Sequence, residues 1–130
     1  MKTIWSILLS FFLFVVPVAA SYSVQGSFDI ALRQGNVTEL FKYVGGNMSI
    51  NMGTYPVTYS KAQAERVLKD FFDKNPPVSF EIKHVGSGSN KTKFEIGILE
   101  TSNATYRVYI SAKELDNSVV IIQEIKFVKI

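Results

Sequence analysis

The chain has 130 residues, of which 47% are hydrophobic and 19% charged, and its net charge is +3. This size and apolar content predict a single folded domain rather than a disordered chain. With no cysteine and one histidine, the sequence excludes disulfides, thiol catalysis and cysteine or multi-histidine metal centres, so we expect neither a metal nor a cofactor. Lys and Arg never stand next to each other, which argues against nucleic acid as a partner.

Residues 1–20 are typical of a secretory signal segment. Lys2 provides the charged start, residues 4–16 are almost wholly apolar, and Ala20 would precede the cleavage site. We therefore expect an exported protein, periplasmic or secreted, whose single domain covers residues 21–130 and contains no membrane span. The alternative is an uncleaved anchor, because about 17 residues of this kind reach the lower limit for crossing a bilayer.

Three helices are expected in the first half of the domain. Apolar residues recur at helical spacing over residues 24–32, and Gly35 supplies the left-handed position at which such a helix ends. Asn36 is placed to cap a second, short helix. Ser60 is placed to cap a third, which extends to Asn75.

Strands dominate the second half. Residues 48–52 and 55–59 are short strand-like runs that precede the third helix. After it, side chains alternate with a period of two over residues 78–84, 92–98, 106–110 and 119–128. Because short loops join these runs, they predict an antiparallel meander. The order of elements therefore predicts an α+β domain, with three helices packed on a curved antiparallel sheet of four to six strands.

This order of elements, together with residues 28–36, resembles the nuclear transport factor 2-like fold, also called cystatin-like or SnoaL-like. Closer similarity is to a secreted Bacteroidetes family of about this length, classed as a domain of unknown function. It lies in residues 59–65, 70–72, 84–86 and 106–109. The resemblance implies a cone-shaped fold that forms a pocket. It brings no established activity and no catalytic residue, so fold analogy leaves the function open.

Alternation within the strands predicts which side chains face the helices. Phe80, Ile82 and Phe94 are expected to do so, together with the other large apolar residues of each strand. The predicted core consists of Val37, Leu40, Phe41, Val67, Leu68, Phe71, Phe80, Ile82, Phe94, Ile96, Val108, Ile110, Ile121 and Ile125.

The opposite face of the sheet is expected to be polar. Arg107 and Tyr109 are the candidate ligand- or partner-binding residues on it, because Arg and Tyr suit anionic groups and are enriched where proteins meet. The alternative for Arg107 is a cross-strand ion pair with a glutamate. Glutamates that alternate with apolar residues are interpreted as solvated, so no carboxylate pair suited to hydrolysis is expected. The residues assigned to this face are Glu81, Lys83, Glu95, Arg107 and Tyr109, with Glu124 or Lys126.

His84 is the candidate general base, because it is the only imidazole and alternation places it on the inward face. With Tyr106 or Tyr55 as the acid, it would support a small-molecule isomerase or dehydratase. The alternative is a structural histidine at the end of a strand. Since no complete catalytic motif is present, the favoured function is a non-catalytic binding or interaction module of the bacterial envelope. Its partner would be a small ligand, an envelope protein or a second copy bound through the sheet face.

Overall fold

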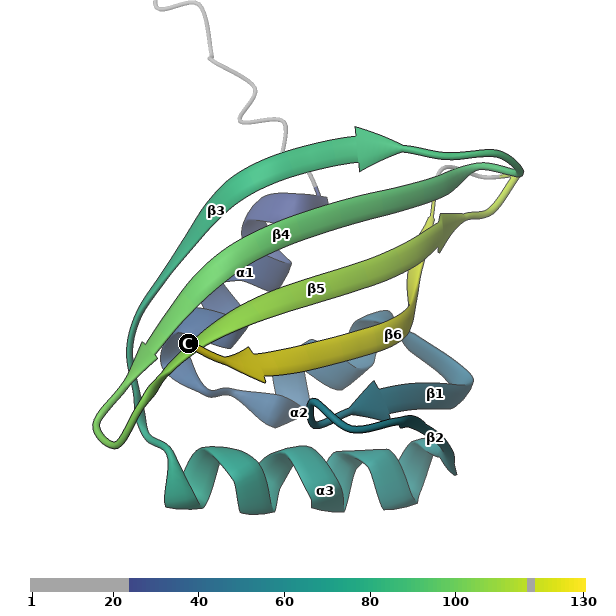
Figure 1. Ribbon diagram of the computed structural model, residues 1–130. Helices are drawn as coiled ribbons and strands as arrows, with labels where there is room; N and C mark the ends of the chain where they lie inside the picture. The colour runs from purple at the N-terminus through teal and green to yellow at the C-terminus, as the bar shows by residue number, and fades with distance from the viewer. Residues whose placement is uncertain (1–23, 117–118) are drawn as a thin grey trace, which may run out of the picture.

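The computed structural model describes residues 24–116 and 119–130, and within residues 24–27 it describes the backbone only. The expected signal segment, residues 1–20, and the cleavage site before Ser21 lie outside this range. Helices cover the concave side of a curved six-stranded sheet, and the long strands arch over them (Figure 1). This arrangement confirms the predicted α+β class.

The helices begin and end where the capping residues predict. Gly35 has a φ of +64°, and the Asn36 side chain accepts a hydrogen bond from the Glu39 N–H. Ser60 and Gln63 form a reciprocal capping box at the start of the longest described helix. The helices are α1 (Val24–Gln34), α2 (Val37–Leu40), the 3-10 turn η1 (Phe41–Tyr43) and α3 (Lys61–Lys74).

The sheet has the strand order β2-β1-β6-β5-β4-β3. Strands β3 to β6 form the predicted antiparallel meander. However, β1 runs parallel to β6, so the expectation of a wholly antiparallel sheet is wrong. Along the chain, β2 and α3 come between β1 and the meander. The last strand of the meander, β6, then returns beside β1 and runs in the same direction. The strands are β1 (Val44–Asn51), β2 (Pro56–Ser60), β3 (Pro77–Ser87), β4 (Thr92–Thr101), β5 (Thr105–Glu114) and β6 (Val120–Lys129).

The core lies between the concave face of the sheet and the three helices. Most of the predicted core is confirmed, and Val67, Phe71 and Ile82 are partly buried against it. The prediction for Ile121 is wrong, because on β6 its neighbour Ile122 is the buried residue. The ring of Phe71 lies against that of Phe127, with 4.4 Å between the ring centroids. The confirmed, fully buried members are Val37, Leu40, Phe41, Leu68, Phe80, Val108, Ile110 and Ile125.

Strand β4 faces the opposite way from the prediction. Glu95, Gly97 and Leu99 are buried toward the helices, whereas the side chain of Phe94 is 44% exposed and Ile96 shares its outward side. The predictions that Phe94 and Ile96 are core residues and that Glu95 is solvated are therefore wrong. The large apolar side chains of Phe94 and Ile96 favoured the other orientation of β4. In the structure, however, the ring of Phe80 on β3 needs the space that Gly97 leaves.

Strand β3 contains a bulge that reverses its alternation. Ile82 pairs with Gly97, which faces inward, but the register then shifts and His84 pairs with Ile96, which faces outward. A bulge adds one residue to one strand, so the side chains beyond it change face. For this reason His84 is exposed and does not share the inward face of Phe80.

Candidate functional site

The three residues considered for catalysis lie apart. His84 is on the outward side of β3, at one edge of the sheet. Tyr55 is 69% exposed and precedes β2, at the other edge. The hydroxyl of Tyr106 donates a hydrogen bond to Asn75 Oδ1 at 3.2 Å, which ties β5 to the end of α3. These positions do not place a base and an acid around one ligand.

The outward side of the meander, which we call the outward face, carries Arg107 and Tyr109 as expected. Its members from β3 to β6 include Glu81, His84, Phe94, Ile96, Ile98, Arg107, Tyr109, Lys126 and Val128. Arg107 stands between Ile98 and Val128 on the neighbouring strands. The ammonium group of Lys126 lies 5.6 Å from the centre of the Tyr109 ring.

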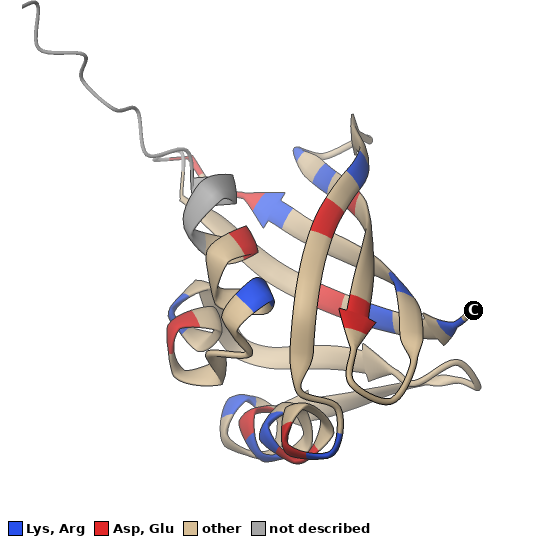
Figure 2. Cartoon of the chain, turned by 90° about the vertical axis from the view of Figure 1, so that its left-hand side faces the viewer, with Lys and Arg blue, Asp and Glu red and all other residues tan. Residues whose placement is uncertain are grey.

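The outward face combines apolar and charged side chains. Glu81 pairs with Lys83 at 3.2 Å, and no carboxylate in the described ranges lies within ion-pair distance of Arg107. Figure 2 shows acidic and basic residues interspersed along the strands rather than gathered by sign. The Arg107 guanidinium is therefore available to a partner, beside the apolar side chains of β4.

Two carboxyl groups meet on the inward side of the sheet. Glu95 of β4 is 7% exposed, and Asp29 of α1 is near enough for the Glu95 carboxyl to act on its pKa. Burial raises the pKa of Asp29 to about 7, the nearby Glu95 adds to the rise, and the Arg33 guanidinium one turn further along α1 opposes it. We call Asp29 and Glu95 the carboxyl pair.

Sequence reasoning missed the carboxyl pair because it placed Glu95 on the wrong face. The sequence did contain one signal for the pair, namely the position of Asp29, which lies three residues before Leu32 on the buried stripe of α1. An acid at such a position needs a partner from the sheet.

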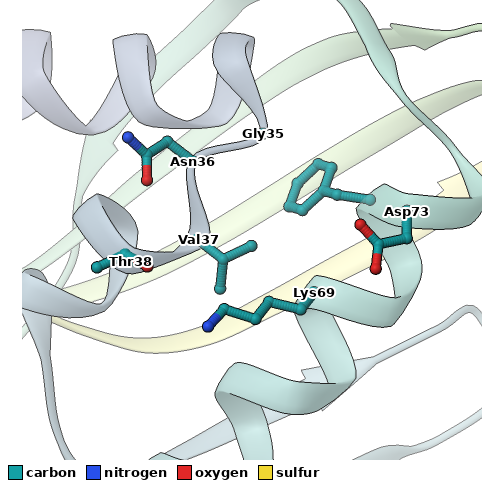
Figure 3. A pocket seen from close by; sticks show the side chains of 7 residues that line it. Gly35, Asn36, Val37, Thr38, Lys69 and Asp73 are labelled. Carbon is teal, nitrogen blue, oxygen red and sulfur yellow. The ribbon is translucent and has the colours of Figure 1, made fainter.

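A cavity of about 280 Å³ lies between the start of α2 and α3 (Figure 3). Lys69 and Asp73 of α3 face the segment from Gly35 to Thr38 across it. Lys69 already pairs with Glu65 at 3.2 Å. The cavity contains none of the predicted site residues. It lies at the junction of two helices, and neither Asp29 nor Glu95 lines it.

Two features are absent from the part of the chain that the structure describes. It contains no cluster of three or more His, Cys, Asp or Glu side chains able to hold a metal ion. Among the helices of that part, none is both long enough and apolar enough to cross a membrane.

Nearly all of the domain matches one family model. Residues 26–127 match DUF4783, a domain of unknown function. The chain belongs to the DUF4783 family. A DUF4783 protein of Bacteroides uniformis is 29% identical in sequence, with a TM-score of 0.76 over 83% of this chain and 98% of that one. A second, from Bacteroides ovatus, is 28% identical, with a TM-score of 0.74 over 80% and 93%.

More distant structures place the DUF4783 domain within the wider fold predicted from the sequence. An NTF2-like protein of unknown function from Cytophaga hutchinsonii is 12% identical, with a TM-score of 0.57 over 82% of this chain and 87% of that one. At this identity the likeness shows the fold alone, and it confirms the predicted nuclear transport factor 2-like architecture. No curated protein matches the chain.

Proposed function

We propose that this DUF4783 protein is an exported, non-catalytic interaction module of the bacterial envelope that binds its partner through the outward face. The observation that carries the proposal is the orientation of β4, which directs Phe94, Ile96 and Ile98 away from the core. Large apolar side chains gathered on one surface are a mark of interaction sites. Export is supported by the sequence of residues 1–20 alone.

The composition of the outward face favours a protein partner. Fully burying one large apolar side chain contributes about 1.5–3 kcal/mol, so the three on β4 offer a substantial driving force. Arg107 and Tyr109 stand beside them on β5, and Arg and Tyr are the residue types that most often dominate binding energy at interfaces.

A second copy of this chain fits the outward face best. The face carries both signs of charge, with Glu81 on β3 and Arg107 and Lys126 on β5 and β6. In a two-fold dimer each patch meets its own copy, so a face that presents both signs can pair opposite charges across the axis. A face of one sign would repel its copy.

The positions of His84, Tyr55 and Tyr106 support the non-catalytic function over the enzymatic alternative. An isomerase or dehydratase needs its base and acid within hydrogen-bond reach of one substrate. His84 and Tyr55 are exposed at opposite edges of the sheet, and the Tyr106 hydroxyl is engaged by Asn75.

Analytical ultracentrifugation of the purified domain tests the homodimer. We expect the wild-type protein to dimerise and the variants Ile98→Lys and Arg107→Ala/Tyr109→Ala to be folded and weakened in self-association. Ile30→Lys is the matched control, because Ile30 is 50% exposed on α1, away from the outward face. A wild-type protein that stays monomeric at its highest soluble concentration would rule out the second copy. Equal weakening by Ile30→Lys would rule out this face.

Export has a test of its own. N-terminal sequencing of the protein recovered from the envelope fraction of its host should begin at Ser21. A protein that keeps Met1 and stays in the cytoplasmic fraction would contradict an envelope role without bearing on the dimer.

A further inference from the structure

The cavity between α2 and α3 has a firmly held wall on its α2 side. Gly35 turns the chain between α1 and α2 with a φ of +64°, and a β-carbon there would lie 3.0 Å from Cγ of Pro77. The N–H of Asn36 donates to the Ala31 carbonyl at 2.8 Å, and its side-chain oxygen accepts from the Glu39 N–H at 3.2 Å. Contacts of the fold itself therefore hold this wall in place, which lowers the cost of binding a ligand.

The cavity combines an apolar surface with two opposite charges. Val37 and Phe72, which are both buried, supply the apolar surface. Lys69 and Asp73 stand four residues apart on α3, so both side chains lie on the side of that helix that faces α2. In Figure 3 the Lys69 side chain extends from α3 toward α2, whereas the Asp73 carboxylate stays close to α3. An ammonium group and a carboxylate are thus presented to the same cavity.

These two charges do not pair with each other. Lys69 pairs instead with Glu65 at 3.2 Å, one turn in the other direction. Among the residues that the structure describes, no cation lies within ion-pair distance of Asp73. The pair of Lys69 with Glu65 is exposed and therefore weak, and an ammonium group has three donors, so Lys69 can bind a second anion. Asp73 is free to bind a cation.

The volume and the charges of the cavity define the class of ligand. At about 280 Å³ the cavity lies just below the range of about 300–1,000 Å³ that is typical of pockets for drug-sized molecules, so it suits a smaller one. A purely anionic or purely cationic molecule would meet one like charge in this cavity. A molecule that carries both charges can pair with Lys69 and Asp73 at once.

We propose that the cavity between α2 and α3 binds a small zwitterion, a free amino acid or a short peptide, whose ammonium group pairs with Asp73 and whose carboxylate pairs with Lys69. Val37 and Phe72 contact its apolar part. Charge-assisted hydrogen bonds at both ends give the site its selectivity. This site is separate from the outward face and does not depend on dimerisation, so either proposal can fail without the other.

An NMR titration of the purified, ¹⁵N-labelled protein with alanine and with the dipeptide Ala-Ala tests the proposal. We expect at least one of them to shift the amide signals of residues 35–38 and 69–73 in a saturable way, and the two titrations distinguish the free amino acid from the peptide. The N-acetylated form of the ligand lacks the ammonium group, and its amidated form lacks the carboxylate. Each should bind about ten-fold or more weakly, because one charge-assisted hydrogen bond contributes at least this factor.

Two substitutions in the cavity and two beside it locate the site. Asp73→Asn and Lys69→Met each remove one charge and should weaken binding about ten-fold or more. Asp70→Asn and Lys74→Met change the same residue types at the same spacing on α3. Asp70 and Lys74 form an exposed pair at 3.0 Å that does not line the cavity, so these two variants should bind as the wild type does.

Three results would each overturn the proposal. The first is that neither alanine nor Ala-Ala shifts the signals of the cavity residues, even near its solubility limit. The second is that the acetylated and amidated forms bind as tightly as the zwitterion. The third is that all four variants weaken binding equally, because the effect would then come from the overall charge of α3 and not from the cavity.

Discussion

The ring of Phe80 on β3 occupies the space above Gly97 on β4. A β-carbon on Gly97 would lie 2.6 Å from both Cε2 and Cζ of that ring, and 2.9 Å from the Glu81 carbonyl oxygen. Since β-carbons are not found this close to other heavy atoms, the Phe80 ring can be buried here only if residue 97 is a glycine. This one contact fixes which side of β4 faces the helices, and it thereby places Glu95 inside and Phe94 outside.

Replacing Gly97 with alanine is therefore expected to destabilise the domain by about 1–3 kcal/mol, the usual range for overpacking a well-filled core. The Glu81 carbonyl belongs to the backbone, so a rotation of the Phe80 ring alone cannot relieve the clash. Urea denaturation measures the change. Gly46→Ala is the control, because a β-carbon at Gly46 meets nothing within 4 Å. Equal stability of the two variants would contradict this account of the β4 orientation.

Local signals in the sequence predicted the elements well. The caps at Gly35, Asn36 and Ser60 act over a few residues, so the sequence around each one contains the whole cause of the helix boundary. The meander followed from alternation and short loops for the same reason. The family was also recognisable, because its motifs extend over the whole domain.

Features that depend on contacts between distant segments were not predictable from pattern. The facing of β4 depends on the fit of Phe80 against Gly97, and the facing of His84 depends on a bulge opposite Ile96. The carboxyl pair consists of Asp29 and Glu95, which are 66 positions apart in the sequence. It depends on the orientation of β4, because that orientation turns Glu95 inward. Hydrophobic content alone favoured the opposite orientation of β4.

Replacing Phe71 with alanine should lower the free energy of unfolding by about 3 kcal/mol, at the low end for aromatic truncations because the side chain is only partly buried. Its ring contacts those of Tyr106 and Phe127, with centroid distances of 5.2 Å and 4.4 Å, so it connects α3 to β5 and β6. Thermal or urea unfolding measures the effect. Tyr55→Ala, which truncates an exposed ring, should change stability by about 0.5 kcal/mol or less. A similarly small effect for Phe71→Ala would mean that α3 is not packed on β5 and β6 in this way.

Replacing Tyr106 with phenylalanine removes one hydroxyl and leaves the ring in place. The hydroxyl donates to Asn75 Oδ1, whose amide nitrogen in turn donates to the Phe71 carbonyl at the end of α3. We expect a loss of about 0.5–1.5 kcal/mol, the usual net value of one hydrogen bond. In Tyr106→Phe/Asn75→Ala the two losses should be less than additive, because the partners share one interaction. Strict additivity in this double-mutant cycle would show that the two side chains act independently.

The global stability of the domain should also depend on pH through the carboxyl pair. The pKa of Asp29 is raised from 3.8 to about 7 in the folded protein, so folding takes up a proton between these two values. A carboxyl with a raised pKa has its full stabilising effect below its unfolded pKa. That effect is lost as the pH rises toward its folded pKa, and it changes no further above it. Asp29→Asn cannot titrate, so its stability relative to wild type should rise from about pH 4 to about pH 7 and then stay constant. Urea denaturation of both proteins across this range measures the difference, with Asp73→Asn as the exposed control. A difference that falls as the pH rises, or that matches the Asp73→Asn control, would contradict a proton bound at Asp29.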